Sequence, residues 1–169
     1  MADVKLAYSS ATTLTITSLN SLATSATAAW QSDAIDNSSN KYLDILVHAE
    51  FAAVNTAAAN SKAWFLWVAG LVDTAGSAYT ASGSDVPSGS QGTITIPDFT
   101  ANAIPLRPLG RIPYSTTNKV LNGGPFSVAQ AFGGIIPPKI ALVIANHTGY
   151  TSAASGNAVK WLGVYETVV

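Results

Sequence analysis

Residues 42–51, YLDILVHAEF, alternate apolar and polar side chains more regularly than any other stretch of the chain. One face carries Leu43, Ile45, Val47, Ala49 and Phe51, and the other carries Tyr42, Asp44, Leu46, His48 and Glu50. Successive side chains of a β-strand point to opposite faces of its sheet. This period of two therefore predicts a strand with one face on a hydrophobic core.

The run KAWFLWVAGLVD, residues 62–73, differs because it is apolar on both faces. Trp64, Leu66 and Val68 would share one face of a strand, whereas Phe65 and Trp67 would share the opposite face. A strand that is covered on both sides lies in the middle of a sheet. We therefore expect a central strand here, whose second cover could be another chain.

Other strand-like runs are separated by turn-forming Gly, Pro, Ser and Asn. They are TLTITSL (13–19), AAWQSDAID (28–36), TITIPDF (93–99), PFSVAQAF (125–132), KIALVIAN (139–146) and NAVKWLGVYETVV (157–169). The sequence shows no convincing amphipathic helix and no internal repeat. About eight strands with long connections predict an all-β fold, a two-sheet antiparallel β-sandwich of jelly-roll type.

The length of 169 residues corresponds to one domain, which we assign to residues 27–169. Residues 1–26 are rich in Ser, Thr and Ala and poor in large apolar side chains. Such a segment does not form a core of its own. We expect an extended N-terminal arm or edge strand, whose deletion would leave the sandwich folded.

Charged residues make up only 10% of the chain, against about 25% in an average globular protein. This deficit predicts that partner chains cover much of the surface. The net charge of −1, without a basic stripe, argues against a nucleic-acid partner. The sequence also has no cysteine, no run long enough to span a membrane and no signal-peptide core near its start. We therefore expect no membrane partner and synthesis in a cytoplasm.

The motifs of serine hydrolases, zinc proteases and phosphate-binding loops are absent from the sequence. We therefore predict no catalytic residue, no metal and no cofactor. The best polar group is Asp44, His48 and Glu50 on the outer face of the 42–51 strand, where a metal would need ligands from another strand. We expect instead a solvated or interface-facing row, in which His48 could make assembly depend on pH.

Residues 103–114, AIPLRPLGRIPY, contain three prolines, each of which lacks a donor for a central ladder. An edge strand or a path across the surface is expected, with Arg107 and Arg111 on one face. These two residues are either interface residues that pair with a partner chain or ordinary surface charges.

Trp30, Trp64, Trp67 and Trp161 are the candidates for a sugar-binding platform. Because Trp64 and Trp67 fall on opposite faces of one strand, they cannot line one platform there. We expect the tryptophans to pack in the core or between subunits, with Trp67 as an interface candidate.

The stretch VIANHTGYTSAASGN, residues 143–157, contains Asn146-His147-Thr148, formally an N-glycosylation acceptor. We interpret this match as chance because no signal peptide is evident. The pattern predicts a strand that ends at Asn146 and a turn that uses Gly149. If the following loop does more than connect strands, we expect it, with His147, to touch a neighbouring subunit.

The ordered pieces QSDAIDNSSNKYLDILVHAEF, GGPFSVAQAFGGIIPPKIALVIANHTG and GNAVKWLGVYETV together resemble virion structural proteins of tailed bacteriophages. The likeness runs from about residue 28 onward and is closest to capsid decoration, or cement, proteins. It implies a β-sandwich or jelly-roll module that sits on the capsid as a homotrimer and clamps major capsid protein subunits together. It transfers no site residues.

We therefore expect a non-enzymatic decoration protein, located on the capsid surface of the virion and made in a bacterial host. Its partners would be the major capsid protein and other copies of itself. One alternative is a tail, neck or fibre component, and a second is a carbohydrate-binding β-sandwich module. The interface candidates are Asp44, His48, Glu50, Trp67, Arg107, Arg111 and His147.

Overall fold

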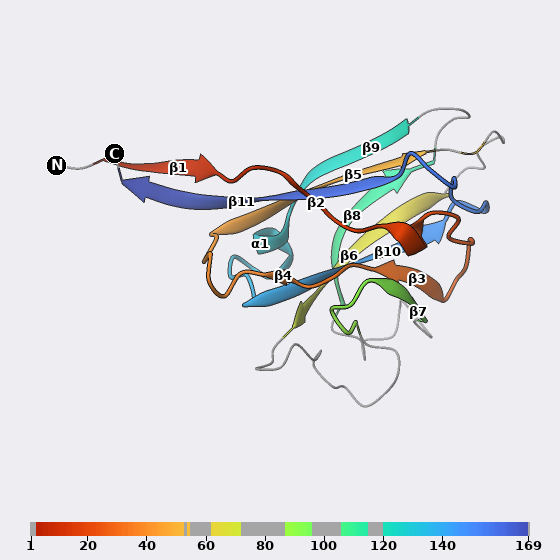
Figure 1. Ribbon diagram of the computed structural model, residues 1–169, viewed down its shortest axis with the longest axis horizontal. Coiled ribbons are helices and arrows are strands. Elements are labelled where there is room, and N and C mark those ends of the chain that lie inside the picture. Colours follow the sequence, from red (N-terminus) through yellow and green to blue (C-terminus); the bar gives the residue numbers. More distant parts are fainter. Residues whose placement is uncertain are drawn as a thin grey trace.

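The computed structural model describes residues 3–52, 54, 62–71, 87–95, 106–114 and 120–168. These residues form two antiparallel sheets that pack face to face (Figure 1). The predicted all-β sandwich is therefore confirmed. The only helices among the described residues are one short α-helix and one 3₁₀ turn, α1 (Val128–Ala131) and η1 (Thr17–Leu19).

The first sheet has four main strands, and the second has five. In the first, the order is β1 (Val4–Tyr8), β11 (Ala158–Val168), β5 (Asp44–Ala52) and β9 (Val120–Ser127), with β2 (Thr12–Thr13) beside β11. In the second, the order is β7 (Gly92–Thr95), β3 (Ala28–Gln31), β10 (Lys139–His147), β6 (Ala63–Leu71) and β8 (Leu106–Pro113), with β4 (Ile35–Asp36) beside β10. Residues 96–99 of the expected strand TITIPDF lie outside the described residues.

The main core lies between β5 and β6, as the alternation of β5 predicted. Ile45, Val47, Ala49 and Phe51 of β5 are fully buried. The Phe51 ring stacks on the Trp64 ring of β6 at a centroid distance of 4.4 Å.

The prediction that β6 is central and apolar on both faces is also confirmed. The strand lies between β10 and β8. Trp64 belongs to the main core, whereas Phe65 and Trp67 pack on a second cluster that includes Val143 and Ala145. Apolar residues therefore line both sides of this sheet.

Two predicted strands end earlier than expected. TLTITSL is extended only at Thr13 and then turns into η1. PFSVAQAF ends its strand at Ser127, where the Ser127 side chain accepts a hydrogen bond from the Gln130 N–H (3.0 Å) and starts α1. In both cases the helical turn carries a buried apolar side chain, Leu19 or Val128, into the core.

The expected arm over residues 1–26 is in part integrated into the sandwich. Its first part is an edge strand, because β1 pairs only with β11 among the described residues. Leu14, Leu19 and Leu22, however, are buried in the main core. Within this segment, the residues outside the core therefore end at about Thr13.

The loop after β10 fastens this N-terminal segment. The buried Asn146 amide donates to the carbonyls of Leu22 (2.9 Å) and Tyr150 (2.7 Å), and its oxygen accepts from the Thr148 hydroxyl (2.7 Å). Ser152 donates to the Leu19 carbonyl (2.6 Å). The loop thus contacts the N-terminal segment of its own chain, and the Asn146 amide is too buried to accept a glycan.

The 106–113 segment is an edge strand, as its prolines predicted, but Arg107 and Arg111 do not share a face. The register changes between Leu66, which lies opposite Gly110, and Trp67, which lies opposite Pro108. At this bulge Leu109 has no partner residue on β6. Residues of β8 on the two sides of Leu109 therefore do not continue the same alternation of faces. Arg111 therefore lies opposite Phe65, whereas Arg107 lies opposite Val68.

β1 and the end of β11 project beyond the rest of the sandwich as a two-stranded extension (Figure 1). We call the paired residues Val4–Tyr8 and Val164–Val168 the ribbon. Val4 and Val168 pair at its tip. None of the ribbon residues belongs to the main core cluster.

We predict that Leu19→Ala lowers the free energy of unfolding by about 2–5 kcal/mol, because it opens a cavity in the core. Leu6→Ala removes the same atoms from a side chain that is 62% exposed and should change it by about 0.5 kcal/mol or less. Urea unfolding of both variants measures the difference. Equal effects would contradict the placement of η1 in the core.

Candidate interaction surface at the ribbon end

Exposed apolar side chains gather at one end of the molecule. Eight large hydrophobic side chains are exposed among the described residues, and all but Val120 lie in the ribbon or in the two adjoining loops. These seven are Val4, Leu6, Tyr8, Leu43, Ile135, Tyr165 and Val168. Scattered single hydrophobics are ordinary, whereas exposed apolar side chains gathered at one end of a molecule indicate an interaction surface. We call this region the ribbon end.

One face of the ribbon is apolar except for Glu166. Val4, Leu6 and Tyr8 are spaced by two and lie on one side of β1, opposite Val168, Glu166 and Val164. The three β1 side chains are each more than 60% exposed. Glu166 is the one charged residue among these six, and it has no ion-pair partner among the described residues.

The opposite face of β11 is held down by aromatic packing. The Tyr42 ring occupies the space above Gly163, where a Cβ atom would collide with it. Trp161 and Tyr165 flank the same ring at centroid distances of 6.1 and 6.2 Å. The Leu43 N–H donates to the Val164 carbonyl (2.7 Å). The root of the ribbon is therefore fixed to the start of β5.

A groove lies beside this aromatic cluster, between the turn before β5 and the loop before β10. Its hollow is about 410 Å³ and is lined mainly by apolar side chains. Tyr42, Leu43, Ile135, Ile136 and Pro138 supply the apolar lining, and Lys41 adds a charge. Ile135 is 81% exposed, the highest value among the large hydrophobics.

Hydrogen bonds set the shape of the turn that forms one wall of the groove. The Asn37 amide oxygen accepts from the Tyr42 N–H (2.7 Å), and the Lys41 N–H donates to the Asn37 carbonyl (2.9 Å). Lys41 adopts φ +52°, a backbone conformation that is uncommon for residues other than glycine and asparagine. The turn is therefore a closed, defined structure.

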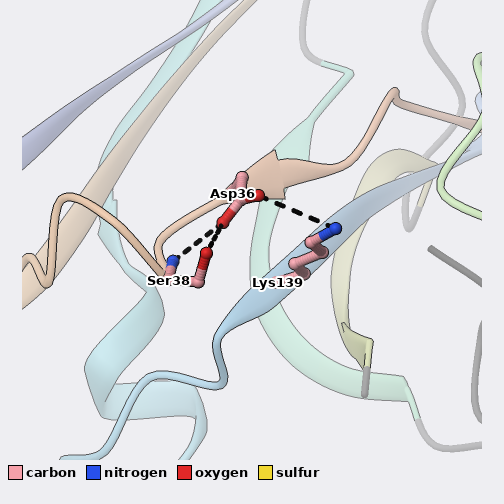
Figure 2. Close-up of polar contacts among 3 residues, drawn as sticks. All are labelled: Asp36, Ser38 and Lys139. Atoms are coloured by element: carbon pink, nitrogen blue, oxygen red, sulfur yellow. Dashed lines mark hydrogen bonds and ion pairs between the residues drawn. The ribbon is translucent and has the colours of Figure 1, made fainter. Parts of the chain in front are cut away.

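A second set of contacts anchors the turn to β10 (Figure 2). The Asp36 carboxylate accepts hydrogen bonds from the Ser38 hydroxyl (2.6 Å) and N–H (2.8 Å) and lies 3.7 Å from the Lys139 ammonium. The hydrogen bonds from Ser38, and secondarily Lys139, lower the pKa of Asp36. These contacts fix the groove wall but leave Lys41 at its rim exposed.

The predicted polar row on β5 is only partly a unit. His48 and Glu50 are 3.4 Å apart, and Lys160 of β11 lies opposite His48. Asp44 instead accepts a hydrogen bond from the Ala129 N–H at the start of α1 (2.8 Å). No group of three His, Asp or Glu side chains in the described part of the chain could hold a metal.

Trp67, Arg111 and His147 lie together on the outer face of the second sheet, centred on Phe65. The Arg111 guanidinium lies over the Phe65 ring at 5.7 Å, and the His147 ring meets it edge-on at 5.3 Å. Burial lowers the pKa of His147. Trp67 and Arg111 line a hollow of about 400 Å³ between β6 and β8. Arg107 lies on the opposite face of β8.

The ribbon end was not among the predicted site residues. Val4, Leu6 and Tyr8 alternate at a period of two, a signal that the Ser- and Thr-rich composition around them concealed. Two adjacent isoleucines between glycine and proline pairs, GGIIPP, gave the second signal. Apolar residues in a short loop have little chance of complete burial, which makes such a run a surface candidate.

Comparison with known proteins identifies no relative of this chain. No protein-family model matches the sequence, and neither the curated proteins nor the solved structures contain a match. No helix in the described ranges is both long and apolar enough to cross a membrane.

We predict that Gly163→Ala lowers the free energy of unfolding by about 1–3 kcal/mol, because the new methyl group displaces the Tyr42 ring. Gly92→Ala is the matched control, since a Cβ there meets nothing within 4 Å. Chemical denaturation followed by tryptophan fluorescence gives both values. A neutral Gly163→Ala would show that Tyr42 does not hold the ribbon root.

We predict that Asn146→Ala lowers the free energy of unfolding by about 1–3 kcal/mol, since it removes buried hydrogen bonds to the N-terminal segment. Asn122→Ala changes an exposed asparagine of β9 and should lie within about 0.5 kcal/mol of the original protein. Hydrogen exchange of residues 19–25 should accelerate in the first variant only. Unchanged exchange there would contradict the fastening role of Asn146.

Proposed function

We propose that this chain is a non-enzymatic structural protein of a tailed-phage virion, and more specifically a capsid decoration protein. In this proposal it binds the outer surface of the head as a homotrimer and bridges major capsid protein subunits. The observation that carries the proposal is the gathering of exposed apolar side chains at the ribbon end. A surface of that kind is built to be covered by protein.

The physical chemistry of the ribbon end supports an assembly role. Each square ångström of apolar surface that leaves water contributes about 25 cal/mol, so a projecting apolar ribbon gains most when it lies against a partner. The chain also has only 10% charged residues, well below the value of about 25% that is usual for globular proteins. Both features favour a protein that works inside a larger assembly.

The strand order supports the jelly-roll part of the proposal. With β7 set aside, eight main strands remain, namely β1, β3, β5, β6, β8, β9, β10 and β11, and the first sheet contains the first, eighth, third and sixth of them in that order. The second sheet contains the second, seventh, fourth and fifth, with β7 added at the edge. Two interlocked Greek keys produce this order, which is found in viral capsid domains and in lectins.

The same fold is compatible with the carbohydrate-binding alternative, but the tryptophans do not favour it. Trp30 is fully buried and Trp64 is 1% exposed, so neither offers a ring face to a sugar. Trp67 and Trp161 are partly buried and lie on different sheets. A glycan platform made of these four residues is therefore disfavoured. The other alternative, a tail, neck or fibre component, would use the ribbon end equally well.

The test is the copy number of the protein in purified virions, measured by quantitative mass spectrometry. A decoration protein should be present at hundreds of copies per particle and map to the shell. A number in the tens would favour the tail, neck or fibre alternative. Absence from virions would overturn the proposal.

We predict that Val4→Asp reduces particle occupancy by about tenfold or more, because it places a carboxylate in the apolar ribbon face. Val120→Asp introduces the same change at a valine of β9 that is 52% exposed and lies outside the ribbon end. It should leave occupancy unchanged. Binding to particles that lack the protein measures both, and equal occupancy for the two variants would contradict a role for the ribbon end.

A further inference from the structure

We infer that the partner at the ribbon end is a second copy of this chain, and that the ribbon of one copy docks into the groove of the next. The inference deepens the proposed function, on which its place in a virion rests, by assigning the contact that joins the copies. The self-association itself follows from the ribbon and groove and is tested on the isolated protein.

The apolar face of the ribbon and the groove cannot cover each other within one chain. Tyr42, which lines the groove, packs on the face of β11 that carries Gly163 and Tyr165. Val4 and Leu6 belong to the opposite face of the ribbon, because Ala7 is the β1 residue opposite Tyr165. Both surfaces therefore stay exposed until other molecules arrive, and one type of contact between identical chains covers both.

The two surfaces match in chemistry. The ribbon is a narrow, two-stranded projection with Val4, Leu6 and Val168 exposed near its tip. The groove is a hollow of about 410 Å³ with Leu43 and Ile135 exposed beside it. Apolar residues thus stand on both sides of the contact, and its centre can exclude water.

Charge adds complementarity to this contact. Glu166 lies within the apolar face of the ribbon and is exposed, as is Asp3 next to β1. Lys41 stands exposed at the rim of the groove. None of the three makes an ion pair with another described residue. A carboxylate in a docking face is costly unless a cation meets it, and Lys41 of the next copy supplies that cation.

A contact between two different surfaces of identical chains is heterologous, and it closes into a ring when the rotation between copies permits. The ribbon and the groove lie at the same end of one chain, because Tyr42 contacts the root of the ribbon and also lines the groove. In a ring of such chains, all ribbon–groove contacts would surround one symmetry axis. Symmetric pairing of two β1 edges is the competing arrangement. Lys5, the second residue of β1, opposes it, because a lysine on an edge strand discourages edge-to-edge pairing.

The chain contains no cysteine, so two single-cysteine variants, Leu6→Cys and Ile135→Cys, give a direct test. After mild oxidation, a mixture of the two should yield a disulfide-linked dimer that contains one copy of each. Neither variant alone should give a comparable yield. A strong dimer of Leu6→Cys alone would indicate β1 pairing and overturn the inference, as would the absence of any mixed dimer.

Charge reversal provides the second test, read by native mass spectrometry of the isolated protein. Glu166→Lys and Lys41→Glu should each weaken self-association by about tenfold, and the double variant should restore it. Lack of rescue by the double variant would overturn the pairing of these two residues. Self-association by this contact in a protein absent from virions would refute the proposed function alone. A monomer present at hundreds of copies would refute the inference and the homotrimer, and would leave the decoration role standing.

Discussion

The stacked contact between Phe51 and Trp64 joins the two sheets, and the rest of the structure depends on the packing around it. Both side chains are almost completely buried, and they lie where β5 ends and β6 begins. Because interiors are close-packed, this contact sets the distance and register between the sheets. The strand alternation then determines which residues remain on the two outer faces and at the ends.

The ribbon forms where β11 extends beyond β5, its partner in the core sheet. β11 has eleven residues and β5 has nine, and their pairing begins near Ala158, so the last residues of β11 extend beyond β5. Only β1 pairs with this overhang among the described residues. Tyr42 over Gly163 supports its root, but nothing in the core supports its tip. The fold therefore places apolar side chains in water at one end while the sandwich itself stays well packed.

The fold was largely predictable from the sequence because burial follows strand period. Ile45, Val47 and Phe51 are buried as their spacing required, and the prolines of residues 106–113 gave the edge position of β8. Long-range contacts explain what could not be predicted. Asp44 accepts a hydrogen bond from Ala129, 85 residues away, where the chain turns into α1. One bulge at Leu109 separated Arg107 from Arg111, and single-residue register changes leave no clear sequence pattern.

The candidate site was harder to predict, because exposure depends on what packs above a residue. The alternation in VKLAY resembles that of YLDILVHAEF, but Leu6 is exposed whereas Val47 is buried. The difference lies in the face of the sheet, because Leu6 shares the outer face with Glu166 and His48, whereas Val47 faces the second sheet. Polar residues such as His48 were predicted as site residues because the residue type itself indicates possible chemistry. A docking surface, in contrast, depends on how residues are arranged in the folded chain.

The size of the ribbon end bears on how such a protein would hold to a particle. A stable complex of two proteins commonly buries about 1,200–2,000 Å², which is more than a few exposed side chains on a narrow ribbon provide. One copy would therefore bind weakly, and ring closure would be needed before several weak contacts act together. Linking the contacts raises the effective concentration of each once the first has formed. In the proposed arrangement, ribbon–groove contacts first join the copies into a ring. The ring then binds the particle more tightly than a single copy would, because its several weak contacts act together.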